Sequence, residues 1–493
     1  MTLLLGPIII PLLTATLCLL LRDSRAAMRV TSLLGTFCLA YVGAMLYLHV
    51  QENGPLSAQM GGWDGPFGIT LVADLLSATL VMLTGILSLC VVIFGYSDLT
   101  FGEERNGHMV FTQVLLAGVC GAFLAGDLFN LYVWFEVMLI ASFGLLVVGG
   151  KSIQIDGAVK YVGLNLIATT AMLAGIGLIY GATGGLNLAH LHLLLDGRGG
   201  EPAVLTAAAL LLFAFATKSA MFPLFFWLPA AYHTPAHTTS TLFAALLTKV
   251  GIYTLLRVFT LVFDLQHPLI QSLLWISGVL TLTVGVFGAI HEVQARRVLA
   301  FLVMVSIGIM TLGMAAGDVA ALKGTLLYLM QTLIVTAALF MAVGCVAYLS
   351  GTERLDEMGG LWRSHPVVGS LFVLIMLGVA GIPPTSGFWP KVLLMDAFAS
   401  EQHWGLVIAV ALGSLGTLYA VMRLFSAAFW QEPKAPLPEL NLDFNRAAPM
   451  TALAFLVVGL GISAEFLIQV ADQASQALTD PSLYIERVLG AQP

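Results

Sequence analysis

Three lysines and one glutamate lie inside stretches of the sequence that are otherwise apolar. Glu136 lies in LFNLYVWFEVMLIASFG, Lys218 and Lys249 lie in residues 213–257, and Lys391 lies in GVAGIPPTSGFWPKVLLMDAF. A charged side chain at the centre of a bilayer costs about 2.5–3.5 kcal/mol, so such residues normally face a wet path or a partner. Because amines and carboxylates also exchange protons, these four residues are candidates for a proton path.

One stretch combines two of the lysines with an interruption. A hydrophobic helix carries Lys218 and is expected to break at Pro223, and a polar turn with His233 and His237 precedes the apolar run that carries Lys249. Lys249 lies about twelve residues inside that run, hence about 18 Å along a helix axis and close to the middle of a bilayer. The alternative, in which each lysine extends to an interface, fits Lys249 poorly.

Glu136 has no basic residue within its own helix with which it could pair. An isolated carboxylate at this depth must take up a proton or meet a cation on another helix, and Lys218 is the obvious candidate. The alternative is a neutral glutamic acid held by hydrogen bonds in the core.

Three further polar residues could extend the set. His233 and His237 could relay protons, since histidine titrates near neutrality, or could be structural. Gln331, in LLYLMQTLIVTAALF, could bridge Lys249 and Lys391 through water or form a hydrogen bond between helices. No other His, Cys or carboxylate stands at ligand spacing near the two histidines, so no metal site is expected.

The composition identifies the kind of protein that must position these residues. Of 493 residues, 59% are apolar and only 10% are charged, and the mean hydropathy is +0.96, whereas soluble domains carry about 25% charged residues. The chain is therefore expected to be an all-α polytopic membrane protein. Windows of about 20 apolar residues predict fourteen spans: 3–21, 29–50, 70–95, 109–126, 128–149, 158–181, 204–223, 238–263, 270–291, 298–316, 322–349, 366–399, 404–430 and 448–470.

Basic residues predict the orientation of these spans. They gather in six of the odd-to-even connections, after the first, third, fifth, ninth, eleventh and thirteenth spans, and the 51–69 connection has neither Lys nor Arg. Since cytoplasmic loops carry an excess of Lys and Arg, the odd-to-even connections are expected in the cytoplasm and both termini on the outer side. The polar tail from Ala471, amphipathic around Leu483 to Leu489, is expected along the outer surface or against a neighbouring protein.

Spans seven and twelve share a pattern. The twelfth contains Gly381, Pro383, Pro384 and Pro390 beside Lys391, which cannot all lie in one straight helix. Corresponding interrupted helices in two halves indicate inverted repeats with the transport path at the interruptions. We therefore expect two inverted five-helix repeats, spans 4–8 and 9–13. The expected parts are 1–108 with the first three spans, 109–263, 264–430, and 431–493 with the last helix and tail.

The remaining charged and thiol-bearing residues suggest fewer roles. Asp74 is expected to be either interfacial or functional, and Asp127 to cap a helix. Arg257 and Arg423, near the ends of their spans, are expected to reach an interface or bind lipid. The five cysteines lie in apolar runs without a CxxC. No glycine-rich phosphate loop or basic run is present, so neither a cofactor nor nucleic acid is expected.

Three motifs carry a family resemblance: FATKSAMFPLFFWLPAAYHTPAHTTSTLFAALLTKVGIYTLLR, EVQARRVLAFLVMVSIGIMTLG and GIPPTSGFWPKVLL. They resemble the antiporter-like membrane subunits of respiratory complex I and of the Mrp-type cation/proton antiporters, and among these the D-type Mrp subunits. The resemblance runs from about the third to the thirteenth span. It implies a transporter subunit, not an enzyme, in a bacterial inner membrane, with the other Mrp-type subunits (A, B, C, E, F and G) as partners.

The resemblance also implies roles for particular residues. Glu136 and Lys218 would form a charge pair, Lys249 would be a relay lysine, and Lys391 would be the terminal lysine of a proton path that drives Na⁺ or K⁺ exchange. The sequence departs from the D-type pattern in the eleventh span, where Met330, Gln331 and Thr336 stand in place of basic residues. An alternative is therefore an N- or M-type proton-pumping subunit of complex I, or a subunit of a membrane-bound hydrogenase.

A third class of function is a self-contained transporter of a small organic solute. Such a protein would need a midplane pocket with polar groups of ligand size. The polar residues here form a line of lysines across two halves instead, which favours proton transfer.

Overall fold

The computed structural model describes residues 1–434 and 436–490, and helices make up most of this part of the chain. Eleven helices in the described part are long and apolar enough to cross a membrane. They are α1 (Thr2–Leu20), α2 (Arg25–Asn53), α3 (Leu75–Asp98), α6 (Leu128–Val147), α7 (Ser152–Thr183), the continuous segment α11–η1–α12 (His237–Leu261), α13 (Pro268–His291), α14 (Ala295–Ala316), α15 (Val319–Ser350), α19 with η2 (Trp404–Trp430) and α20 (Phe444–Ile462).

Three shorter apolar helices accompany them: α5 (His108–Leu124), α9 (Pro202–Lys218) and α17 (Pro366–Ala380). Short elements connect the long helices or close the chain: α4 (Phe101–Arg105), α8 (Leu188–Leu194), α10 (Trp227–Ala231), α16 (Leu361–Ser364), α18 (Phe388–Ser400), α21 (Glu465–Thr479) and α22 (Ser482–Leu489). The only strands in the described residues are β1 (Leu56–Gln59) and β2 (Thr70–Ala73), which pair antiparallel.

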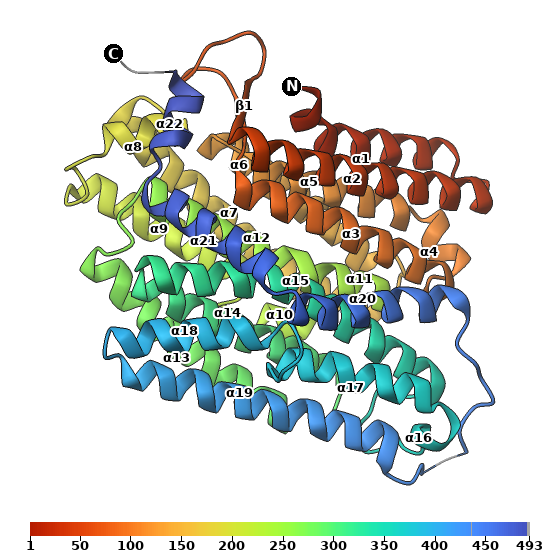
Figure 1. The fold of residues 1–493 in the computed structure, drawn as a ribbon. Helices are drawn as coiled ribbons and strands as arrows, with labels where there is room; N and C mark the ends of the chain where they lie inside the picture. The colour runs from red at the N-terminus through yellow and green to blue at the C-terminus, as the bar shows by residue number, and fades with distance from the viewer. Residues whose placement is uncertain (435, 491–493) are drawn as a thin grey trace.

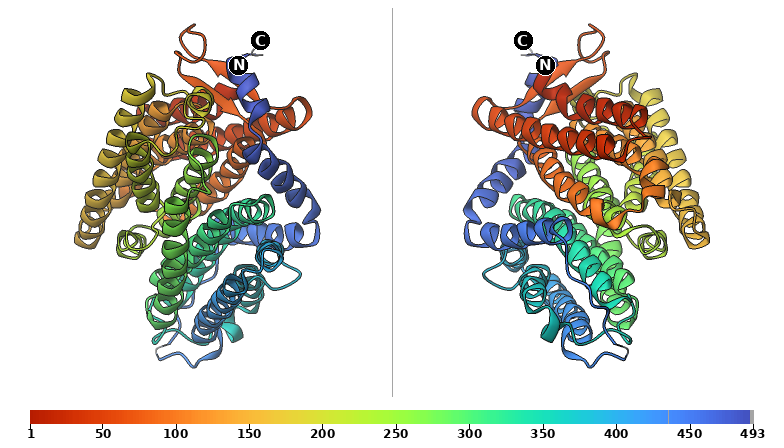
Figure 2. Two further views of the ribbon diagram at one scale, coloured as in Figure 1. Left: turned by 90° about the vertical axis from the view of Figure 1, so that its left-hand side faces the viewer. Right: turned by 90° about the vertical axis from the view of Figure 1, so that its right-hand side faces the viewer.

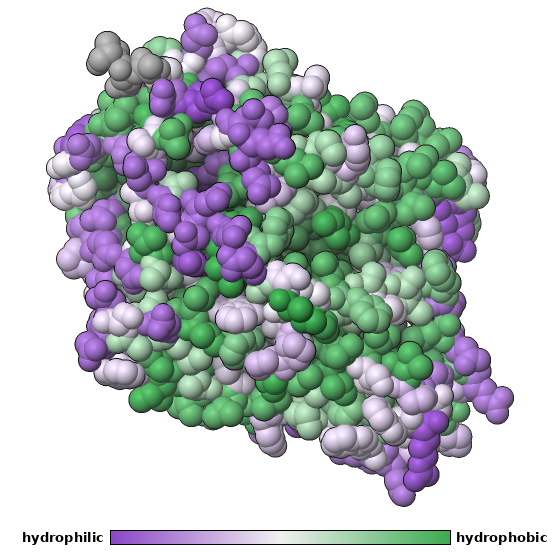
Figure 3. Space-filling view, in the orientation of Figure 1, coloured by the Kyte–Doolittle hydropathy of each residue, from purple (hydrophilic) through white to green (hydrophobic). Residues whose placement is uncertain are grey.

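The helices run side by side across the molecule (Figure 1). Two ends of the bundle are named here for what they contain. The hairpin end holds the β1–β2 hairpin, α8, α22 and the start of α1. The Arg-rich end holds α4 and the connections that contacts join to it: Arg25 pairs with Glu104 of α4, Asp98 at the end of α3 binds Thr238, and Arg296 pairs with Glu353. Figure 2 shows helices from the first and second halves of the chain as two adjacent groups. Figure 3 shows apolar residues over most of the surface between polar residues at the upper left and lower right.

Two of the three innermost segments carry candidate residues, Lys249 on α12 and Gln331 on α15. Of the most apolar part of each segment, 100% is buried within the protein for α11–η1–α12, 94% for α14 and 89% for α15, against 39% for α1. Lys249 and Gln331 therefore lie in the core, where protein and not lipid surrounds them.

Residues suited to capping begin several of these helices. Asp127 accepts hydrogen bonds from the backbone N–H groups of Phe129 and Asn130 at the start of α6, which confirms the cap expected there. Asp74 and Ser77 form a reciprocal capping box at the start of α3.

The structure corrects three boundaries. Residues 70–73, expected in the third span, form β2, because they pair with β1 in the connection that precedes the helix. The helix that carries Lys218 ends at that residue and not at Pro223. The last span, expected to reach residue 470, ends at Ile462, and α21 starts a new direction at Glu465. The tail packs mainly on its own chain, since α21 contacts α15 and α3 and α22 contacts β1 and α8.

Candidate functional site

The first interruption lies between α9 and α10. α9 ends with Lys218, and the indole N–H of Trp227 at the start of α10 donates to the carbonyl of Thr217 at 3.0 Å. A Cβ added at Gly251 would lie only 3.0 Å from the carbonyl carbon of Lys218. The glycine thus lets α12 approach the end of α9, one turn or less beyond Lys249.

Lys218 is buried, with 7% of its surface exposed. Its ammonium lies 5.5 Å from the centre of the Phe135 ring on α6, within the range of a cation–π contact. Glu136, the next residue on α6, is half-buried. No ion pair within 4.0 Å joins Glu136 to Lys218 in the described structure, so the two expected partners are neighbours without direct contact.

Lys249 is fully buried, and its ammonium donates to the carbonyl of Ala244 at 2.7 Å. Ala244 lies in η1 (Phe243–Leu247), a π-helical segment between α11 and α12. A π-helical turn alters the regular pairing of helix carbonyls and often marks a functional site. The next carbonyl back, that of Phe243, accepts from the hydroxyl of Tyr232 at 3.2 Å. Local backbone geometry therefore supplies the acceptor that a buried ammonium requires.

The second interruption lies between α17 and α18 and supplies acceptors in a different way. Lys391, with 3% of its surface exposed, lies on α18 and donates to the carbonyls of Ala380 at 2.7 Å and Val379 at 3.2 Å. These carbonyls belong to the last turn of α17, where carbonyl groups have no partner within their own helix. Gly381 follows with a left-handed φ of +82°, and a Cβ there would meet the Lys391 side chain at 2.7 Å. The sequence expectation of a broken helix beside Lys391 is thus met.

Gln331 reaches the same helix end from α15. Its amide nitrogen donates to the carbonyl of Gly378 at 3.3 Å, so Gln331 and Lys391 bind consecutive carbonyls of α17. The hydrogen bond between helices expected for Gln331 is therefore present. Its amide oxygen is buried and has no hydrogen-bond partner.

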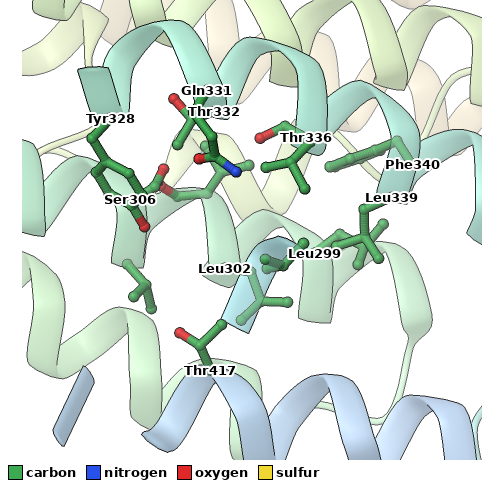
Figure 4. A pocket seen from close by; sticks show the side chains of 14 residues that line it. Leu299, Leu302, Ser306, Tyr328, Gln331, Thr332, Thr336, Leu339, Phe340 and Thr417 are labelled. Carbon is green, nitrogen blue, oxygen red and sulfur yellow. The ribbon is translucent and has the colours of Figure 1, made fainter. Parts of the chain in front are cut away.

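Gln331 also lines a cavity of about 30 Å³ that lies between α14, α15, α17 and α19. Figure 4 shows Gln331 and Thr336 extending from α15 toward Leu299 and Leu302 of α14, with Thr417 opposite. A buried water needs about 10–15 Å³ and two or more polar partners, so the cavity has room for about two water molecules. The polar lining residues are Ser306, Tyr328, Gln331, Thr332, Thr336 and Thr417.

The two histidines lie at the Arg-rich end, between α10 and α12, and make different contacts. His233 has one ring nitrogen 2.9 Å from the carbonyl of Pro229 and the other 3.4 Å from the Arg297 guanidinium. His237, the first residue of α11, has Nε2 3.1 Å from a carboxylate oxygen of Glu353. Neither histidine touches Lys218 or Lys249 through a hydrogen bond in the described structure.

A buried ion pair that the sequence did not predict lies at the hairpin end of α12. Arg257 is buried and pairs with Asp74, the residue that caps α3. The expectation that Arg257 reaches an interface or binds lipid is wrong, because a carboxylate 183 residues earlier lies beside it. The sequence held one indication of this site: Lys249, Tyr253 and Arg257 are spaced four residues apart and so share one face of a helix. This spacing does not identify the residue that pairs with Arg257.

The tail covers this ion pair. Tyr484 of α22 and Tyr253 of α12 lie 5.4 and 5.6 Å from the Arg257 guanidinium. Two further contacts fix α22 to the hairpin: Arg487 donates to the carbonyl of Pro55 at 2.7 Å, and Ser57 donates to the carbonyl of Arg487 at 2.6 Å. Arg423, the other arginine expected at an interface, donates to the backbone carbonyls of Ile290 and Glu292.

The arrangement suits the transfer of protons and little other chemistry. Its buried groups are amines, an amide and hydroxyls, with backbone carbonyls as acceptors. In the described part of the chain, no three His, Cys, Asp or Glu side chains are close enough to hold a metal ion. These features define a class of protein: a polytopic membrane protein whose interrupted helices carry buried lysines.

Comparison with known proteins identifies the family. Residues 125–418 match the family described as NADH:quinone oxidoreductase/Mrp antiporter, TM. The chain belongs to this family of membrane subunits. It is 36% identical over 486 residues to the D subunit of the Na(+)/H(+) antiporter of Bacillus subtilis, with 98% of each chain covered.

Two solved structures share the fold. A chain of the Mrp complex from Dietzia sp. is 29% identical, with 99% of each chain covered and a TM-score of 0.92. A chain of the membrane-bound sulfane sulfur reductase, an archaeal respiratory membrane complex, also gives a TM-score of 0.92, with 99% of this chain and 100% of that chain covered. Its identity of 24% shows a common fold alone.

Proposed function

We propose that this chain is the proton-translocating, D-type subunit of a multisubunit Na⁺/H⁺ or K⁺/H⁺ antiporter. The observation that carries the proposal is the burial of three lysines, Lys218, Lys249 and Lys391, in a protein 36% identical to the D subunit of an Na(+)/H(+) antiporter. Buried ammonium groups are costly in a membrane protein and are kept where they serve a path.

The proposed path crosses the two halves of the chain. Glu136 acts on Lys218 through space, because a low-dielectric interior screens charge poorly. A proton passes by water from Lys218 to Lys249, then past Gln331 and its cavity to Lys391. The contact of Gln331 and Lys391 with consecutive α17 carbonyls supports the last step. Two histidines at the Arg-rich end, His233 and His237, are candidates for proton uptake.

The proposal includes a finer architecture. It has fourteen spans, made of the eleven long helices and the three shorter apolar ones, with inverted repeats in spans 4–8 and 9–13. Its parts are residues 1–108, 109–263, 264–430 and 431–493. The Arg-rich end faces the cytoplasm and the hairpin end faces outward in a bacterial inner membrane. Partners are the other subunits of the complex, which we expect to be of the A, B, C, E, F and G types.

The test measures ΔpH dissipation by added Na⁺ or K⁺ in inverted vesicles that contain the whole complex. Glu136→Ala, Lys218→Ala, Lys249→Ala and Lys391→Ala should abolish exchange while the complex still co-purifies. Lys160→Ala is the matched control, since that lysine is exposed and pairs only with Asp156. Exchange that persists in the Lys218 and Lys391 variants would refute the lysine path.

A redox-driven pump is the second candidate, because the fold is shared with a respiratory membrane complex. No response to cations in the wild type, together with proton pumping driven by a quinone or ferredoxin, would assign the chain to that class.

A further inference from the structure

We infer that His237 is the group that takes up protons at the Arg-rich end, and that Glu353 is the fixed anion that positions it. This inference rests on the proposed proton path and adds a point of uptake to it. Glu353 follows α15, in the second half of the chain, whereas His237 begins the helix that carries Lys249 in the first half. The pair therefore joins the two halves at the start of the central helix.

The two nitrogens of the His237 ring face different surroundings. Nε2 lies 3.1 Å from a Glu353 oxygen, at a place where 21% of the Glu353 side chain is exposed. Nδ1 is buried and has no hydrogen-bond partner. Because Nε2 faces a carboxylate, it carries the hydrogen of the neutral ring and donates it to Glu353, so the lone pair is on Nδ1. The ring takes up a second proton at Nδ1 and returns to the neutral form when one of its two nitrogens gives a proton up.

Glu353 itself does not carry the proton. Arg296 holds both of its oxygens, with nitrogen–oxygen distances of 2.7 and 2.8 Å. Burial alone would raise the pKa of Glu353, but the hydrogen bond with His237 and the charge of Arg296 outweigh burial and lower the pKa to about 2. Glu353 is therefore a carboxylate near neutral pH, and it supplies a fixed negative charge beside the His237 ring.

His233 is poorly suited to the same task. Both of its ring nitrogens already have partners, the Pro229 carbonyl and the Arg297 guanidinium. Burial, followed by the charge of Arg297, lowers the pKa of His233 to about 4. The ring is thus neutral near pH 7 and has no free nitrogen with which to receive a proton.

The other ionisable groups near His237 are held in contacts of their own. Arg296 also donates to the Pro235 carbonyl, and Asp98 of α3 accepts from the backbone and hydroxyl of Thr238. Arg297 faces His233 and Glu292, and His108 of α5 bonds the Thr239 hydroxyl at 2.8 Å. His237 is the one group in this cluster that combines a titratable ring with an unused buried nitrogen.

A substitution at Gly344 should move the His237 ring without changing any charged residue. His237 packs against Gly344 of α15, where an added Cβ would lie 3.1 Å from Cγ of the ring and 3.0 Å from Phe94. Gly344→Ala should therefore displace the imidazole while Glu353 and Arg296 keep their charges. Gly459→Ala on α20 is the matched control, because a Cβ there meets nothing within 4 Å.

The experiment measures cation-driven ΔpH dissipation between pH 6 and 9 in vesicles that contain the full complex. His237→Gln should lower the rate at least about tenfold, as expected for loss of an acid–base group. Glu353→Gln should retain assembly and move the half-maximal pH down by about one unit, because the ring loses its anion. The exchange rate of Gly344→Ala should lie between the rates of the wild type and of His237→Gln. His291→Gln, on the exposed end of α13, should have the wild-type rate.

Three results would overturn the inference: a wild-type rate in His237→Gln, a Glu353→Gln profile that loses rate without moving in pH, or a profile that moves with His233→Gln instead. Absence of cation-driven exchange in the wild type would refute the proposed antiporter function and not the uptake site. In that case the same variants would be compared in redox-driven proton pumping, with the same expected order.

Discussion

The two interruptions, between α9 and α10 and between α17 and α18, use similar residues in different ways. Each contains a cis X–Pro bond and lies beside a buried lysine. Lys391 lies beyond its interruption and reaches back to the carbonyls that end α17. Lys218 lies before its interruption, as the last residue of α9, and faces the Phe135 ring instead of free carbonyls.

The difference lies in the kind of group that each ammonium meets. Lys391 donates to backbone carbonyls at the end of α17, so its acceptors are set by the backbone. Lys218 lies beside an aromatic ring, that of Phe135, and near the side chain of Glu136, the next residue on α6. Changes at the second interruption therefore test backbone geometry, whereas changes at the first test side chains.

The largest effect should come from filling the second interruption. A Cβ at Gly387 would lie 1.9 Å from the Gly378 carbonyl oxygen, so Gly387→Ala must displace the end of α17. Because the clash is with backbone, we expect a loss of about 1–3 kcal/mol in stability and little remaining exchange. Thermal unfolding of the purified complex and vesicle exchange measure the two effects. A Gly387→Ala complex as stable as Gly459→Ala would contradict the description of this interruption.

The second-largest effect on exchange should come from Glu136, beside the first interruption. Glu136→Gln keeps the shape of the side chain and removes its acidic group, so Lys218 loses the partner proposed for it. We expect exchange to fall by about ten- to a hundredfold, which corresponds to about 1.4–2.7 kcal/mol. Asp156→Asn, on the exposed face of α7, is the control. If the rate is unchanged, the lysine at the first interruption responds to another group.

A smaller effect concerns pH, since histidine follows the first interruption whereas residues 380–391 contain none. The pKa of His233 is lowered from 6.5 to about 4, so the folded state resists protonation that the unfolded chain accepts. Stability is therefore fully present above about pH 6.5 and declines as pH falls toward 4. His233→Gln should flatten this decline in unfolding measurements between pH 4 and 8. An equal decline in the variant would show that other groups cause it.

The smallest effect should come from the ring beneath Lys218. A cation–π contact contributes about 0.5–2 kcal/mol, and Phe135→Leu removes it while keeping an apolar side chain. Exchange should fall about two- to fivefold, within the range of that energy. Phe143→Leu, exposed on the same helix, serves as the control. A loss as large as that of Lys218→Ala would mean that Phe135 shapes the interruption itself.

Much of the fold could be predicted because the bilayer imposes strong local constraints. Apolar runs of about 20 residues give the spans, and glycine and proline beside Lys391 give the second interruption. The burial of Lys249 was likewise expected from its place far inside an apolar run. These properties are local in sequence, so one chain is enough to reveal them.

The pairings could not be predicted in the same way. Asp74 meets Arg257, and His237 meets Glu353, only because distant helices pack together. A residue near the end of a span looks the same in sequence whether lipid, water or a carboxylate surrounds it. The π-helical segment before Lys249 is equally hidden, because FAALL carries no residue that breaks a regular helix.

The docking of α22 on the hairpin has a consequence for how the protein is made. The hairpin lies within the first 73 residues, whereas the segment that covers it begins at Ser482. A ribosome synthesises the chain from the N-terminus. The hairpin therefore remains uncovered until almost every other residue has been synthesised. Truncated chains that lack α22 would leave the edge of the hairpin and Arg257 uncovered. Exposure of this edge would distinguish incomplete chains from complete ones.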